Sequence, residues 1–166
     1  GTIQLPDMLS GESRDIVLTV SLPANDIEKP FLTGHVTYKT PGNEEAENII
    51  VAPLVVKRPD STRCQANVTV NTQRNRVLAS EALKKAAELG QKNQLEAARE
   101  TLQGAIDAIE ASVSKKEPLC KDLIKDLKST KDRLASASTF QAGGYAQMTA
   151  QMNMHGRQRQ TAGVSS

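Results

Sequence analysis

The sequence has very few aromatic residues, and this scarcity argues against a large class of functions. Aromatic side chains make up 2% of the chain, as Phe31, Tyr38, Phe140 and Tyr145, and tryptophan is absent. Proteins that bind single-stranded nucleic acid stack bases on aromatic side chains. Proteins that bind nucleic acid also concentrate Lys and Arg on one face. With a net charge of only +2, the sequence predicts no nucleic-acid partner and an aliphatic core.

Charge is spread thinly along the chain. Residues 1–70 carry six Lys/Arg against nine Asp/Glu, a net charge of −3. Residues 71–137 carry thirteen against ten, a net charge of +3, and the remainder adds two arginines. No segment therefore produces a strong field of one sign.

Cysteine is almost as scarce, and its placement argues against a metal site. Cys64 and Cys120 are the two cysteines, they lie far apart, and neither belongs to a CxxC pair of the kind that holds zinc. We expect two reduced thiols in a cytoplasmic protein with no metal and no cofactor. There is no apolar run long enough to cross a membrane and no signal peptide, so we expect no membrane partner.

Groups that could carry catalysis are also few. His35 and His155 are the two side chains with an ordinary pKa near neutral pH. His35 falls on the polar side of a predicted strand, and His155 falls in a predicted flexible segment, which is poor support for a catalytic group. No nucleophile-elbow, phosphate-loop, zinc-protease or dinucleotide motif occurs. The sequence therefore predicts no enzyme activity, no catalytic residue and no small-molecule substrate.

Residues 1–66 have the alternation and turn signals of β-structure. Pro53 interrupts the last apolar run and indicates an edge strand or a bulge. A β-sandwich needs about seven strands, so a sheet of about four would be incomplete and would need a cover, either from the helical half or from strands upstream. The four predicted strands are residues 2–5, 15–21, 31–39 and 48–57.

Residues 67–137 carry helical periodicity and predict an antiparallel three-helix bundle. The segment Ala66–Asn71 has two readings, as a fifth strand or as the first helical turn with Asn67 as N-cap. Gly90 is the expected end of the first helix, and Asn93 with Glu96 resembles a capping box for the second. The third helix is expected from Glu117 or Pro118 to about residue 136.

Residues 138–166 are rich in Gln, Met and Gly and predict a flexible tail. An alternative is a segment that docks on a partner through Met148, Met152 and Met154, because methionine adapts to varied surfaces. The predicted fold class is thus α+β, with a β-sandwich-like antiparallel sheet, a three-helix antiparallel bundle and a flexible tail.

The order of these parts resembles a known family. The motifs that carry the resemblance are Arg58-Pro59, Gln73-Arg74-Asn75-Arg76-Val77, the helical hairpin at Gly90, and His155-Gly156-Arg157-Gln158-Arg159. Together they resemble the Vwaint region, which follows the von Willebrand factor A (vWA) domain in intracellular eukaryotic vWA proteins, some of which are ubiquitin ligases. The resemblance implies a β-sandwich and helices packed on an upstream vWA domain, and favours helix from about Asn67. Neither the vWA domain with its metal site nor a RING lies in this sequence, so metal binding and ubiquitin transfer are not assigned to it.

The resulting hypothesis is a non-catalytic protein–protein interaction and scaffold region that supports a vWA domain. The alternatives are the substrate-recognition arm of a vWA-containing ubiquitin ligase and a free-standing structural adaptor. The residues predicted to make polar docking contacts with a partner are Arg74, Arg76, Arg157 and Arg159.

Overall fold

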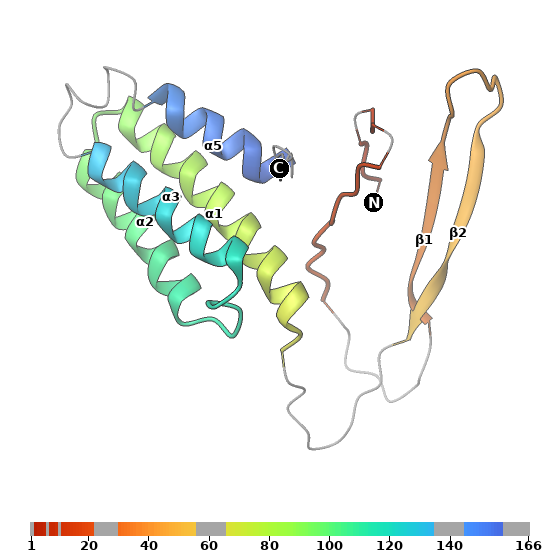
Figure 1. The fold of residues 1–166 in the computed structure, drawn as a ribbon, viewed down its shortest axis with the longest axis horizontal. Helices are drawn as coiled ribbons and strands as arrows, with labels where there is room; N and C mark the ends of the chain where they lie inside the picture. Colours follow the sequence, from red (N-terminus) through yellow and green to blue (C-terminus); the bar gives the residue numbers. More distant parts are fainter. Residues whose placement is uncertain are drawn as a thin grey trace, which may run out of the picture. The chain divides into compact units, whose positions relative to one another are not determined.

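The computed structural model describes residues 2–5, 7–9, 11–21, 30–55, 66–134 and 145–157. Two compact units are present: Thr19–Cys64 forms one, and Gly1–Leu18 with Gln65–Ser166 forms the other. No helix in the described part of the chain is long and apolar enough to cross a membrane. The elements are β1 (Pro30–Tyr38), β2 (Glu47–Val55), α1 (Val68–Gln91), α2 (Leu95–Glu110), α3 (Pro118–Arg133) and α5 (Tyr145–Arg157) (Figure 1).

The predicted fold class is wrong, because the described residues form two antiparallel strands and four helices rather than a four-stranded sandwich before a three-helix bundle. The alternating segment 15–21 does not join a sheet. Ile16 and Leu18 stay about half exposed. Alternation makes a strand only where a neighbouring strand supplies hydrogen bonds, and residues 2–5 and 15–21 have no such neighbour among the residues that the structure describes.

The two strands that do form make a β-hairpin. Val36 pairs with Ile49, and Tyr38 pairs with Glu47. A turn joins the two strands, with Gly42 at φ +87° and the Asn43 backbone N–H donating to the Thr40 carbonyl. The ladder loses register between the pairs Leu32–Leu54 and Gly34–Val51. This irregularity lies at Pro53, which has no N–H to donate, in agreement with the edge strand or bulge predicted there. A second register shift lies between the pairs Pro30–Val55 and Leu32–Leu54.

Helix α1 resolves the ambiguous segment Ala66–Asn71. It begins at Val68, and the Asn67 side chain accepts a hydrogen bond from the Val70 backbone N–H at 3.1 Å. An Asn at this position satisfies one of the amides that the first helical turn leaves unpaired. The helical reading of Asn67 is therefore confirmed.

The turn between α1 and α2 differs from the prediction in detail. Gly90 is buried inside α1, which continues to Gln91. Asn93 is not an N-cap but lies in the turn at φ +57°, and Gln94 precedes α2 without a side-chain cap. Asn tolerates the left-handed conformation better than most residues, so Asn93 stabilises the turn and does not cap α2.

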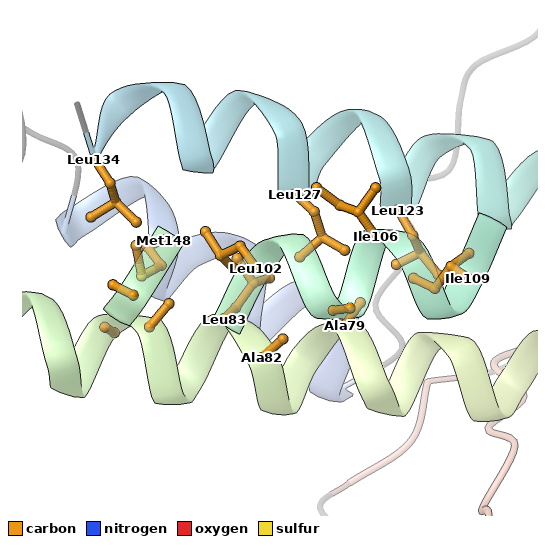
Figure 2. Close-up of a cluster of buried hydrophobic side chains, with 14 of the residues drawn as sticks. Ala79, Ala82, Leu83, Leu102, Ile106, Ile109, Leu123, Leu127, Leu134 and Met148 are labelled. Carbon is orange, nitrogen blue, oxygen red and sulfur yellow. The ribbon is translucent and has the colours of Figure 1, made fainter. Parts of the chain in front are cut away.

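Helix α3 begins with Pro118, as the sequence predicts, and ends three residues earlier than expected, at Arg133. Aliphatic side chains from all four helices then form one core (Figure 2). The largest fully buried ones are Leu83 of α1, Leu102, Ile106 and Ile109 of α2, Leu123 and Leu127 of α3, Leu134 at the end of α3, and Met148 of α5.

The predicted flexible tail is also wrong for residues 145–157, which form helix α5 beside α1 (Figure 1). Ser80 contacts Met152, and Arg76, one turn nearer the start of α1, contacts His155, nearer the end of α5. The two helices are therefore antiparallel.

Candidate functional site

The side chains of α5 that contact the other helices follow one helical stripe. Met148, Gln151, Met152 and His155 stand at positions i, i+3, i+4 and i+7, which share one face of a helix. Met148 is 1% exposed and belongs to the core, and Met152 is partly buried against it. Met154 lies off this stripe and is 43% exposed.

Two residues of the same stripe, Gln151 and His155, make polar contacts with α3. The Thr130 hydroxyl donates to Gln151 Oε1 at 2.7 Å. His155 Nε2 lies 3.1 Å from Asp126 Oδ2, and this contact becomes an ion pair when the imidazole is protonated. His155 is 8% exposed, so the imidazole is fixed between helices rather than carried on a mobile tail.

Arg76 of α1 anchors the end of α5. Its Nη1 donates to the His155 backbone carbonyl, its Nη2 donates to the Asp15 carbonyl at 3.1 Å, and its Nε donates to Gln73 Oε1 at 2.8 Å. Burial lowers the pKa of Arg76, and the nearby charge of Asp15 acts in the opposite direction. A cation is favourable here because carbonyls in the last turn of a helix lack intrahelical partners.

These contacts define a surface that we call the α5-binding face. It consists of Arg76 and Ser80 on α1 and Asp126 and Thr130 on α3. The Ser80 hydroxyl lies 3.4 Å from the Met152 carbonyl. Leu83 and Leu134 share the apolar cluster with Met148 (Figure 2).

A second buried polar cluster joins α1 to the connection before α3. Asn75 Nδ2 donates to Ser112 Oγ at 2.8 Å and to Ser114 Oγ at 3.0 Å, and lies 3.5 Å from Cys120 Sγ. The Ser114 hydroxyl donates to Asn71 Oδ1 at 2.8 Å. Since every member has a partner inside the cluster, it fixes the packing of the bundle and offers no free group to a ligand.

The hairpin presents a different kind of surface. Leu32, Val36 and Tyr38 share one side of β1, because side chains alternate along a strand, and the cross-strand pairs place Ile49 and Val51 there too. Because of the two register shifts, both Leu54 and Val55 pair with positions on this side. We call this set the apolar hairpin face. Its side chains are 38–51% exposed: Leu32, Val36, Tyr38, Ile49, Val51, Leu54 and Val55.

The four arginines predicted as docking contacts differ in their position and exposure in the structure. Arg74 is exposed on α1, whereas Arg76 is 6% exposed and contacts this chain's own α5. Arg157 is the last residue of α5, but its side chain, like Arg159 as a whole, lies outside the described residues. The sequence prediction missed Asp126, Thr130 and Gln151. The i, i+3, i+4, i+7 spacing of Met148 to His155 could have identified the α5 half of these contacts.

The described residues bring together little that could perform chemistry. Among them, no group of three or more His, Cys, Asp or Glu side chains could hold a metal ion. His35 is exposed on β1, and Cys120 is completely buried. A shallow depression at the α1–α2 turn is lined by Asn93, Gln94, Leu95, Glu96 and Ala97, and carries a single carboxylate.

Comparison with protein-family models identifies a family that matches this chain. Residues 66–163, more than half of the chain, match the family model described as CPSF6-like, RSLD domain, N-terminal region. The match covers the four-helix part and begins just before α1. No curated protein and no solved structure matched the chain.

This match corrects the resemblance drawn from the sequence. The residues around Arg76 and His155 that resembled a vWA-associated region lie inside the CPSF6-like match, so the assignment to the vWA-associated family is wrong, and the match conflicts with a vWA-containing ubiquitin ligase. The β-sandwich is wrong because the described sheet has two strands. The predicted upstream vWA partner and the exclusion of nucleic acid are wrong as well, since this family points to an RNA-processing context. The resemblance was misleading because the motifs that carried it were short and because helical Ala/Leu hairpins recur in unrelated folds. The chain belongs to the CPSF6-like RSLD-domain family, whose N-terminal region it matches.

Proposed function

We propose that this chain is a non-catalytic protein-interaction region of an RNA-processing protein, and that it binds a protein partner through the apolar hairpin face. The single observation that carries the proposal is the exposure of seven large apolar side chains on one side of β1 and β2. A contiguous exposed apolar surface of this kind marks an interaction site in soluble proteins.

The two hairpin sides differ in composition, because among the residues whose exposure the structure describes the other side carries one exposed large apolar side chain, Ile50. Val36 and Ile49 form a cross-strand pair on the apolar hairpin face, whereas Thr37 and Asn48 form a pair on the other side, where their side chains hydrogen-bond at 2.7 Å. A two-stranded hairpin is marginally stable in water by itself. A partner that covers the apolar side would remove these side chains from water, at about 25 cal/mol for each Å².

Gly34 adds a shape argument. A Cβ at this position would meet the Val51 side chain at 3.3 Å, so the missing side chain leaves Val51 uncovered in the middle of the apolar hairpin face. A protruding apolar side chain of the partner would fit at this point. The RNA-processing setting comes from the family match alone.

Site-specific photo-crosslinking in cells tests the proposal. A photoreactive amino acid would replace Val36 in the full chain, and a matched control would carry it at the neighbouring His35, which points to the other side. We expect cross-links to a defined protein from position 36 and none to that protein from position 35. Equal cross-linking from both positions would contradict a binding face.

A second candidate function is contact with the RNA backbone through α3. Lys121, Lys125 and Lys128 stand at i, i+4 and i+7 on its exposed side, and Lys115 and Lys116 are exposed just before the helix. Lys128 Nζ already forms an ion pair with Glu110 Oε1 at 2.8 Å, which reduces the positive charge that this row of lysines offers to RNA. Charge reversal of Lys121 and Lys125 to Glu should then abolish binding to a single-stranded RNA at low salt. RNA binding that is unchanged by these substitutions, or absent in the wild type, would exclude this candidate.

A further inference from the structure

We infer that the partner of the apolar hairpin face is a second copy of this chain, and that the two hairpins pack face to face about a two-fold axis. The inference rests on the proposed function, because it concerns the same face, and it goes further by naming the occupant. It involves β1 and β2, which belong to the unit Thr19–Cys64.

The hairpin has no core of its own among the residues whose exposure the structure describes. Every residue from 32 to 55 is exposed, apart from the partly buried Gly34. All the buried residues of the described chain belong to the other unit. Because a two-stranded hairpin is marginally stable in water, it needs a surface that covers its apolar side. A second copy presents the same apolar surface and has the same need.

The area of the apolar hairpin face matches what a weak dimer needs. With seven large apolar residues at 38–51% exposure, the face presents roughly 500 Å² to water, which is near the upper end for the largest apolar patch of a monomer. Two such faces in contact bury roughly 1,000 Å² in total, the lower limit for a specific interface. The pairing of two copies is therefore weak and depends on the concentration of the chain.

The position of Glu47 determines how the two hairpins are oriented. Glu47 pairs with Tyr38 and so places a carboxylate at the turn end of the apolar side, whereas Leu54 and Val55 make the opposite end apolar. In a parallel arrangement the two Glu47 carboxylates would face each other across sheets about 10 Å apart. In an antiparallel arrangement they lie about 25 Å apart, well beyond the Debye length of about 8 Å at physiological salt. The charge therefore favours antiparallel hairpins.

The middle of the apolar hairpin face has the shape that a two-fold axis requires. Gly34 is the central residue of β1, Val51 is the central residue of β2, and the two are cross-strand partners. In an antiparallel pair of identical hairpins the axis passes beside this pair, so the Val51 side chains of the two copies meet there. A Cβ at position 34 would lie 3.3 Å from the Val51 side chain. Glycine at this position therefore leaves room for the second Val51.

Sedimentation equilibrium of the purified full chain over a wide range of concentration tests the pairing. We expect a dimer that dissociates on dilution. Val51→Asp places two carboxylates at the axis and should raise the dimer dissociation constant at least about tenfold. Ile50→Asp is the matched control, because it puts the same charge at the neighbouring position on the other side of β2, where Ile50 is 70% exposed. This control should dimerise as the wild type does.

A second measurement does not depend on a charged substitution that could unfold the hairpin. A photoreactive amino acid in place of Val51 should cross-link two copies of the purified chain, whereas the same group in place of Ile50 should not. When the group replaces Glu47, mass spectrometry should find the cross-link near Leu54 and Val55 of the other copy. A cross-link between the two turn ends would contradict the antiparallel arrangement.

The outcomes separate this inference from the proposed function. A chain that is monomeric at every concentration overturns the inference, as does a dimer that Val51→Asp and Ile50→Asp weaken equally. If the purified chain is monomeric while position 36 still cross-links to a different protein in cells, the second-copy inference fails and the proposed function stands. A monomeric chain without any cross-link from position 36 overturns both.

Discussion

The Arg76 guanidinium of α1 donates a hydrogen bond to the His155 backbone carbonyl near the end of α5, across 79 positions of sequence. The same guanidinium reaches the Asp15 carbonyl in the N-terminal segment. One buried cation thus joins three separated parts of the chain. Sequence patterns predicted Arg76 as a contact to another protein, whereas in the structure its partners are internal.

Replacement of Arg76 by Ala should destabilise the four-helix unit. The substitution removes charge-assisted hydrogen bonds, each worth about 1.5–3 kcal/mol, and leaves the His155 carbonyl without this donor. We expect the free energy of unfolding, measured in urea, to fall by at least the value of one such hydrogen bond, about 1.5–3 kcal/mol. The amides of α5 should show the largest loss of hydrogen-exchange protection. Arg74→Ala is the matched control. Because Arg74 is exposed two residues away on the same helix, its loss should change stability by less than about 0.5 kcal/mol. Equal effects of the two substitutions would contradict the anchoring role of Arg76.

Replacement of Asn75 by Ala should also destabilise the bundle, for a different reason. Ser112 and Ser114 lose a buried donor, and an unpaired buried polar group costs about 1–3 kcal/mol. Thermal or urea unfolding followed by circular dichroism measures this change. Glu81→Ala, at an exposed position of the same helix, should have an effect within about 0.5 kcal/mol. An Asn75→Ala chain as stable as the wild type would show that the cluster does not fix the packing.

The hairpin carries a pH-dependent contact between Tyr38 and Glu47. The phenol donates to Glu47 Oε2 at 2.7 Å, and this hydrogen bond, with burial and the carboxylate charge, raises the pKa of Tyr38 above its ordinary value of 10.0. Since the folded pKa is raised, the contact contributes to hairpin stability below pH 10 and is lost as the pH rises through the folded pKa.

Glu47→Ala should therefore bring the pKa of Tyr38 back toward 10. Carbon-13 NMR of the Tyr38 ring, with Tyr145→Phe to remove the other tyrosine, follows this titration directly. Glu45→Ala, in the exposed turn, should leave the titration unchanged. A Tyr38 pKa that does not move in the Glu47 variant would show that the hydrogen bond is not its cause.

The turn between α1 and α2 depends on a residue that accepts a left-handed backbone. Asn93 has φ +57°, a conformation that costs β-branched residues about 1–2 kcal/mol. Asn93→Val should lower the free energy of unfolding by this amount, whereas Asn93→Gly should leave it within about 0.5 kcal/mol of wild type. Comparison of the two urea-unfolding curves checks the prediction. Indistinguishable curves would mean that the turn relaxes out of this conformation.

Elements with strong local signals could be predicted from the sequence. Pro118 at the start of α3, the Asn67 cap of α1 and the turn at Gly42 all follow from backbone preferences that operate within a few residues. The apolar side of the hairpin was also predictable, because strand alternation is a local pattern.

Features that depend on distant partners could not be predicted. Residues 15–21 alternate as a strand does, but a strand needs a neighbour that the pattern does not supply. Helix α5 gave a weak helical signal, because two of its contact residues, Gln151 and His155, are polar and find their partners, Thr130 and Asp126, more than twenty positions away. The candidate site was missed for the same reason, since it exists only when α1, α3 and α5 assemble.

The most direct test of the account is the affinity of the purified partner, identified by cross-linking at position 36, for two variants of the full chain. Val36→Asp places a charge on the apolar hairpin face, and His35→Asp places the same charge on the opposite side of the same strand. Isothermal titration should show that Val36→Asp weakens binding at least about tenfold, which corresponds to about 1.4 kcal/mol, while His35→Asp binds as the wild type does. Equal weakening by both variants, or none by either, would contradict the proposed interaction face.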